Sequence, residues 1–162
     1  MNRIMTCEGI GISGVPDDEG LRELAAKGVK TLVDTREGAE PGGADMMAKA
    51  AEHGLDYVRI PISKKRLDKE QIERFRRTVL DADRAPVHIF STGGKRPMGI
   101  LCFLACAGRG ESIFEVFRKA KSCGCSIDKE YALKNYIFDF YRANWPEIQL
   151  NYYSRQPGFT RG

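Results

Sequence analysis

Apolar and polar residues follow one another along the chain in blocks that predict strands separated by helices. Short apolar runs typical of buried strands lie at residues 30–34, 56–61 and 86–90. Patterns of helical period lie before and between these runs, at residues 17–27, 43–53 and 68–82. Strands that alternate with helices favour a mostly parallel central sheet flanked by helices on both faces, so we expect an α/β fold.

The C-terminal third of the chain is predicted to be helical. Helical patterns follow the last strand at residues 97–107, 112–122 and 126–145. The 162 residues, 42% of them hydrophobic, suffice for one well-buried core, so we expect a single domain. We divide it into N-terminal strands, core, helical part and a C-terminal arm without periodicity, at residues 1–14, 15–107, 108–145 and 146–162.

Residue types in the helical patterns favour a packed interior with reduced thiols. Cys102 and Cys106 lie in an apolar helix, where free, buried cysteines are usual, and we expect no disulfide. The pair in Cys123-Gly124-Cys125 lacks the spacing of a zinc site, so we expect no metal or cofactor. His88 is expected to be structural. Two methionines and six aromatic residues at helical spacing are also interpreted as core packing; they are Met46, Met47, Phe114, Phe117, Tyr131, Tyr136, Phe138 and Tyr141.

Charge is spread evenly along the chain. The 26 basic and 22 acidic residues leave a net charge of +4 without a basic cluster typical of nucleic-acid binding, which is therefore not expected. Residues 1–14 include Asn2, Arg3 and Glu8, which interrupt any apolar stretch that would serve as a signal peptide or membrane span. We therefore expect a cytoplasmic protein, and a small anionic substrate is compatible with its charge.

The most informative segment is the junction of an apolar strand with a helix at residues 87–97. Between them lies the loop Ser91-Thr92-Gly93-Gly94-Lys95-Arg96. Backbone N–H groups in such a loop converge on an anion, the helix N-terminus adds positive potential, and the Arg96 guanidinium holds two phosphate oxygens. A nucleotide-binding P-loop does not fit, because it requires glycine at Ile89. The junction predicts a phosphate site.

Four segments in order along the chain carry a family resemblance. They are residues 11–16, 28–36, 55–62 and 91–96. Together they resemble the bacterial dual-specificity-like branch of the protein tyrosine phosphatase superfamily, over roughly residues 9–107. The loop of that branch commonly reads Cys-x-x-Gly-x-Arg, which corresponds to Ser91, Gly94 and Arg96 in this sequence. The resemblance implies the dual-specificity phosphatase fold and a substrate that is a phosphoprotein or a small phosphate ester.

The resemblance also implies a mechanism that this sequence does not complete. Family members hydrolyse phosphate monoesters through a cysteine thiolate, which attacks phosphorus and forms a phosphocysteine that water then cleaves. The hydroxyl of Ser91 stays protonated at neutral pH, so the phosphate-binding amides of residues 92–95 remain while the nucleophile is nearly lost. Two explanations stay open: an engineered cysteine-to-serine exchange that traps a ligand, which the otherwise intact loop favours, or a natural pseudophosphatase that binds a phospho-ligand.

The general acid has two candidates. Related phosphatases carry an aspartate soon after the segment that corresponds to Ile60-Pro61, but here Ser63 and the basic run 64–66 follow. Asp68 comes later and has an alternative role as a helix cap with Gln71. Glu37 is the second candidate, with a solvated loop carboxylate as its alternative. The basic run is expected on a surface loop; beside the cleft, it would favour a multiply charged phosphate.

Two other functions are left open by the sequence. Residues 33–37, Val-Asp-Thr-Arg-Glu, resemble a strand-end motif of the rhodanese fold and would imply sulfur transfer. A phospho-binding module without catalysis requires Arg96 and the loop amides but no thiol, and Ser91 favours it. The active loop distinguishes these functions from a phosphatase.

Overall fold

A five-stranded sheet forms the centre of the computed structural model, which describes residues 4–37 and 43–155. In chain order, the strands are β1 (Met5–Cys7), β2 (Ile10–Ser13), β3 (Thr31–Asp34), β4 (Asp56–Arg59) and β5 (Val87–Phe90). The helices are α1 (Asp18–Ala26), α2 (Gly43–Glu52), α3 (Lys69–Val79), α4 (Lys95–Gly108), α5 (Ile113–Ser122), the short 3-10 helix η1 (Ile127–Lys129) and α6 (Tyr131–Arg155).

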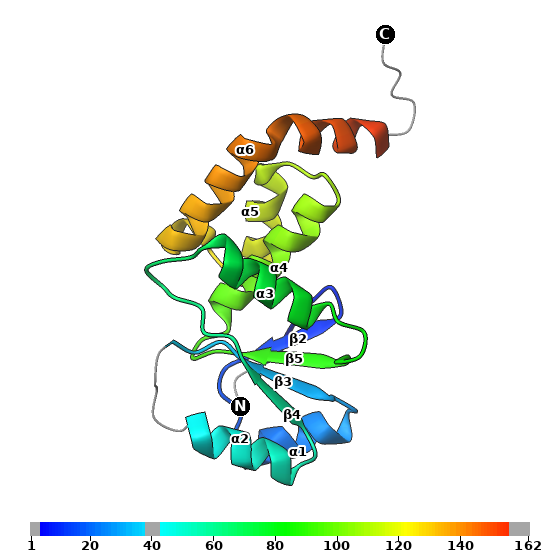
Figure 1. Cartoon of the computed structure of the whole chain (residues 1–162), viewed down its shortest axis with the longest axis vertical. Coiled ribbons are helices and arrows are strands. Elements are labelled where there is room, and N and C mark those ends of the chain that lie inside the picture. The colour runs from blue at the N-terminus through cyan, green and yellow to red at the C-terminus, as the bar shows by residue number, and fades with distance from the viewer. Residues whose placement is uncertain (1–3, 38–42, 156–162) are drawn as a thin grey trace.

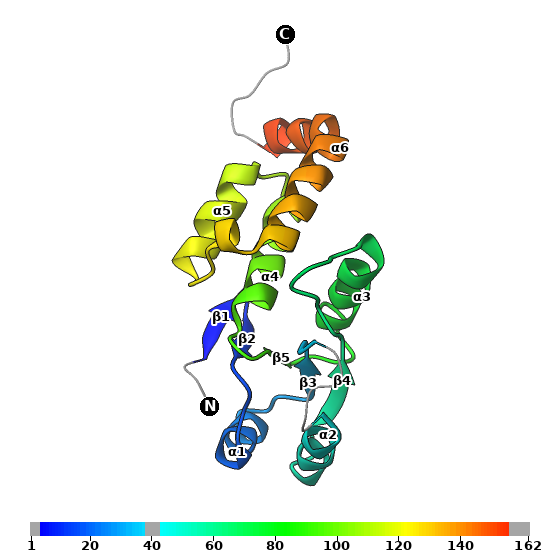
Figure 2. The same ribbon diagram turned by 90° about the vertical axis from the view of Figure 1, so that its left-hand side faces the viewer.

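The strands lie in the order β1-β2-β5-β3-β4, with β1 antiparallel to β2 and the other pairs parallel. Helices α1 and α2 cover one face of the sheet, and α3 to α6 lie on the other side (Figures 1 and 2). The α/β fold with a mostly parallel sheet and a helical C-terminal part is confirmed. Because β5 is central, the segment that follows it lies between the carboxyl ends of β2 and β3.

Local signals explain where the helices begin. The Asp17 carboxylate accepts the N–H of Gly20 at 2.7 Å and caps α1. Asp68 caps α3 through a reciprocal capping box with Gln71, in which each side chain bonds the other's backbone N–H. The capping role that the sequence assigned to Asp68 is confirmed.

Two buried clusters match the two layers of helices. The larger one unites the sheet with α3 to α6 and includes Ile89 and Phe103, and the smaller one unites it with α1 and α2 and includes Leu21 and Phe90. Helix α4 is the most enclosed helix of the larger cluster, because the sheet, α5 and α6 all contact it. Burial on several sides gives the helix that follows the loop a rigid base.

The C-terminal third differs from the prediction in one respect. Helix α6 continues past Pro146 to Arg155, where the sequence predicted an arm; a proline bends a helix without ending it when later residues resume the pattern. Figure 1 shows this helix bent in its second half. Residues 156–162 of the expected arm lie outside the described residues. No helix within the described ranges is long and apolar enough to cross a membrane.

Core packing is confirmed for only part of the aromatic set. Tyr141 is buried, but Phe114 and Tyr131 are 80% and 75% exposed, and Phe138 and Met47 also lie at the surface. Helical spacing places a residue on a face without specifying whether another element covers that face. The five cysteines, all within the described ranges, are free thiols, as predicted.

Candidate functional site

The loop predicted to bind phosphate begins at a fully buried strand and ends at α4. The Ser91 N–H donates to the Ser13 carbonyl at 3.2 Å, which extends the pairing of β5 with β2 by one residue. Gly94 is the N-cap of α4 in the left-handed conformation, with φ of 74°. A side chain there would come within 3.2 Å of the Ser13 carbonyl oxygen, so the close approach requires glycine.

The loop folds back on its first side chain. The N–H of Gly94 donates to the Ser91 Oγ at 2.6 Å. This bond and the N-terminus of α4 place positive potential at the Ser91 side chain. The geometry is suited to stabilising negative charge at that atom or on a ligand beside it.

A cleft of about 300 Å³ lies over the loop. Its lining brings together three separate segments of the chain, namely Thr35-Arg36-Glu37, the loop 91–96 without Gly94, and Glu130. Of the residues predicted for the site, Gly94 and Asp68 do not line the cleft. The Gly94 N–H donates to the Ser91 Oγ, and the Asp68 carboxylate caps the start of α3. Glu37 is the general-acid candidate that the structure brings to the loop.

Arg96 is held by three acceptors. Its Nε donates to Glu130 Oε2 at 3.2 Å, and its Nη1 donates to Glu37 Oε1 and to the Ile62 carbonyl, both at 3.4 Å. The Arg96 side chain is only 19% exposed. The guanidinium therefore lines the cleft as a mostly buried group that three acceptors hold.

A buried ion pair supports the segment Thr35-Arg36-Glu37, which lines the cleft. Arg36 donates to both carboxylate oxygens of Asp34, from Nε at 3.0 Å and from Nη2 at 2.9 Å, and the Tyr57 hydroxyl donates to the same carboxylate. Burial alone would raise the pKa of the Asp34 carboxyl, but these hydrogen bonds outweigh burial and hold the pKa below its ordinary value. The Arg36 guanidinium also lies over the Phe90 ring, 5.3 Å from its centroid. Arg36 thereby joins the ends of β3 and β5.

Other predicted polar residues lie outside the cleft. His88 is 2% exposed, and its Nε2 lies 2.8 Å from the Ser13 Oγ. Burial lowers the pKa of His88 to about 4, so the ring is neutral at pH 7, in keeping with the structural role expected from the sequence. The basic residues at positions 64–66 are exposed, and their backbone is held by Glu37 and Ser63. No cluster of histidine, cysteine or acidic side chains among the described residues is arranged to hold a metal ion.

Glu130 is the site residue that sequence reasoning missed. It follows η1, in a part of the chain that the family resemblance did not reach, and no local motif marks it. The nearest signal is Gly99 on α4. A Cβ on Gly99 would come within 2.7 Å of Leu133 and 3.1 Å of the Cys125 thiol, so glycine allows the segment that carries Glu130 to pack closely on α4.

Comparisons with known proteins show the family of the chain. The family model described as DSP-PTPase phosphatase fused to NAD+ kinase matches residues 9–130, which include both the loop and Glu130. The Beta-lactamase hydrolase-like protein of Agrobacterium fabrum is 28% identical over 102 residues, which are 60% of this chain and 23% of that protein. The chain thus spans less than a quarter of the length of that relative.

Two solved structures show the shared fold. A putative phosphatase from Neisseria meningitidis is 23% identical, with a TM-score of 0.66 over 82% of this chain and 96% of that one. A cysteine-to-serine variant of TpbA from P. aeruginosa, in complex with pTyr, is 16% identical, with a TM-score of 0.64 over 91% of this chain and 86% of that one.

Proposed function

Because the chain belongs to the family described as DSP-PTPase phosphatase fused to NAD+ kinase, we propose that its cleft binds the phosphate group of a phosphate monoester, with Ser91 at the nucleophile position. One observation carries the proposal. The Ser91 Oγ accepts the Gly94 N–H in the same cleft that holds the Arg96 guanidinium. The proposed nucleophile position and an arginine suited to binding phosphate therefore line one cleft.

The chemistry follows from what each group supplies. The amides of residues 92–95 and the N-terminus of α4 bind the non-bridging oxygens, and Arg96 holds two of them in its planar fork. In a cysteine-dependent phosphatase, a thiolate then attacks phosphorus and the ester oxygen leaves with a proton from an acid. Ser91 offers a protonated hydroxyl in place of that thiolate. With Ser91, the chain binds the phosphate group of the ester but hydrolyses the ester very slowly or not at all.

A phosphotyrosyl or other small phosphate ester is the substrate class that the site supports. TpbA from P. aeruginosa was crystallised as a cysteine-to-serine variant in complex with pTyr, and the proposal gives Ser91 the position of such an exchanged cysteine. Of the two general-acid candidates, Glu37 reaches the cleft, whereas Asp68 is engaged as a helix cap. Sulfur transfer of the rhodanese type requires a thiol, and the residues described as lining this cleft include no cysteine.

Replacing Arg96 with alanine is expected to weaken phosphotyrosine binding by about 100-fold, because two charge-assisted hydrogen bonds worth about 3 kcal/mol together are lost. Isothermal titration calorimetry with phosphotyrosine and with inorganic phosphate measures the change. Arg109→Ala is the matched control, since Arg109 is also paired with two glutamates but lies outside the cleft. Equal affinity of Arg96→Ala and the unsubstituted chain would contradict the proposed site.

A further inference from the structure

Two carboxylates hold Arg96 in unlike ways. Glu130 bonds the Nε of Arg96 at 3.2 Å, and the two side chains are almost equally buried, at 18% and 19% exposed. Glu37 bonds the Nη1 end at 3.4 Å and is 43% exposed. The shorter, more enclosed contact is at the base of the guanidinium, and the longer, more open one is at its tip.

Backbone hydrogen bonds and buried neighbours hold Glu130 in place. Its N–H donates to the Ile127 carbonyl at 2.9 Å, and its carbonyl accepts the Lys134 N–H at 2.8 Å, where α6 begins. The flanking Ile127 and Leu133 are buried in the large core, and Leu133 packs against Gly99 of α4. Since Arg96 and Gly99 lie one turn apart on α4, the packing that requires Gly99 also brings Glu130 to Arg96.

Glu37 lies at the mouth of the cleft. Its carboxylate accepts the backbone N–H of Lys64 as well as the Arg96 Nη1, so it spans from the loop before α3 to the guanidinium tip. Arg96 and Glu37 both line the cleft over the loop. A phosphate dianion that takes up the N–H groups of the guanidinium tip meets the Glu37 carboxylate in the same place, and two anions at one donor repel.

We propose that Glu130 is a positioning residue that orients Arg96 for phosphate, and that Glu37 is an internal anion that phosphate must displace from Arg96. The inference rests on the proposed function, because it assigns roles in the same phosphate site. The helical C-terminal part then contributes to the site, because Glu130, directly before α6, contacts Arg96. It also assigns opposite effects to two glutamates that contact one arginine.

The two roles predict opposite changes in phosphate affinity when the two glutamates are replaced. We expect Glu130→Ala to weaken binding of inorganic phosphate by about tenfold and Glu37→Ala to strengthen it by about threefold, as the loss of one positioning hydrogen bond and of one competing charge predicts. General electrostatics alone predicts a different result, because removing either negative charge makes the cleft more positive and would strengthen binding in both variants. Calorimetric titration with inorganic phosphate distinguishes the two.

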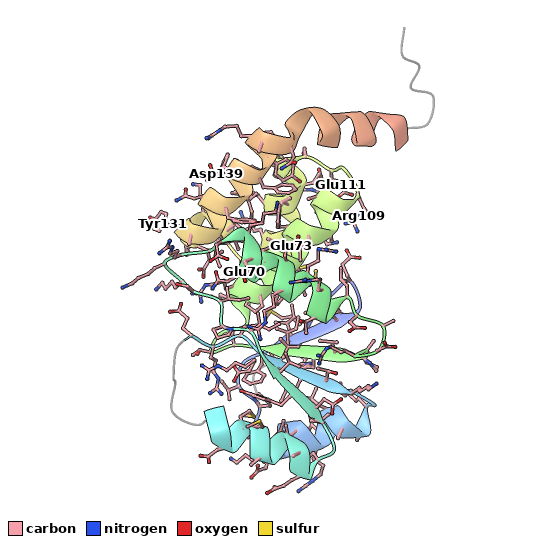
Figure 3. The ribbon with its side chains drawn as sticks, in the orientation of Figure 1. Glu70, Glu73, Arg109, Glu111, Tyr131 and Asp139 are labelled. Carbon is pink, nitrogen blue, oxygen red and sulfur yellow. The ribbon has the colours of Figure 1, made fainter. Side chains whose placement is uncertain are left out.

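Conservative variants separate positioning from charge. In Glu130→Gln the amide oxygen still accepts the Arg96 Nε–H, so most of the affinity should return, and this variant also serves if Glu130→Ala does not fold. Glu37→Gln should bind phosphate as tightly as Glu37→Ala. The matched control is Glu111→Ala, since Glu111 accepts the Nε–H of Arg109 at the same 3.2 Å. Figure 3 shows this pair beyond the end of α4, away from the sheet, and its loss should not change phosphate affinity.

The outcomes are distinguishable. Absence of phosphate binding by the unsubstituted chain would contradict the proposed function and this inference together. Phosphate binding that becomes stronger in Glu130→Ala would overturn the positioning role alone and leave the phosphate site standing. Weaker binding in Glu37→Ala would overturn the displacement and make Glu37 a part of the ligand's own binding set.

Discussion

Replacing Ser91 with cysteine is expected to raise the turnover of an aryl phosphate by about 10³-fold or more, because the variant regains an ionisable nucleophile. The Gly94 N–H that the Ser91 Oγ accepts, together with the N-terminus of α4, lowers the pKa of a thiol placed there. Release of inorganic phosphate from p-nitrophenyl phosphate measures the gain. The pH dependence of alkylation of residue 91, followed by peptide mass spectrometry, reports the thiolate independently of turnover.

Two controls make the result specific to the site. Thr92→Cys places a thiol one residue further along the same loop and should show no gain, since the Gly94 N–H does not face it. Adding Arg96→Ala to Ser91→Cys should remove most of the activity. A reactive thiolate at residue 91 that still releases no phosphate would show that the chain is a binding module whose site lacks more than a nucleophile.

Where a structural feature depends on neighbours in sequence, the sequence predicted it well. The order of strands and helices follows from apolar runs and helical periods, and the capping box of α3 from the spacing of Asp68 and Gln71. The sequence also singled out the loop from Ser91 to Arg96, because it joins a strand to a helix through two glycines, and all of its residues except Gly94 line the cleft.

Features that depend on packing between distant segments were missed or interpreted differently. Glu130 lies 34 positions after Arg96 and reaches it through the close packing at Gly99. The exposed Phe114 and Tyr131 show the same limit, since periodicity does not tell which helix faces solvent. From the sequence, Asp34 and Arg36 were interpreted as part of a rhodanese-like motif. In the structure they form a buried pair that holds the cleft wall.

Replacing Asp34 with alanine is expected to destabilise the fold by about 3–5 kcal/mol, because it leaves the buried Arg36 guanidinium without its carboxylate. The Asp34 side chain is fully buried, and its partner is almost as enclosed. Hydrogen bonds from Thr35 to the Phe90 carbonyl attach the same segment to the end of β5, so the loss also disturbs the wall beside Ser91. Urea unfolding gives the stability change, and phosphate titration of the folded variant gives the effect on the site.

The buried pair also sets a pH dependence with a definite sign. The pKa of Asp34 is lower in the folded chain than its ordinary value of 3.8, so the unfolded chain binds the proton more readily. The stabilisation is fully present above that value and is lost as the pH falls through the folded pKa. As the pH falls from about 5 to about 2, Asp34→Ala should therefore lose less stability than the unsubstituted chain does.

Two controls test whether the burial of the Asp34–Arg36 pair causes the expected loss of stability. Asp128 pairs with Lys134 at 3.2 Å but is 70% exposed, so Asp128→Ala should cost less than about 1 kcal/mol. Removing Arg36 together with Asp34 should cost less than the sum of the two single changes, because the two side chains interact directly. A cost for Asp34→Ala no greater than that for Asp128→Ala would show that the pair is not what holds the cleft wall.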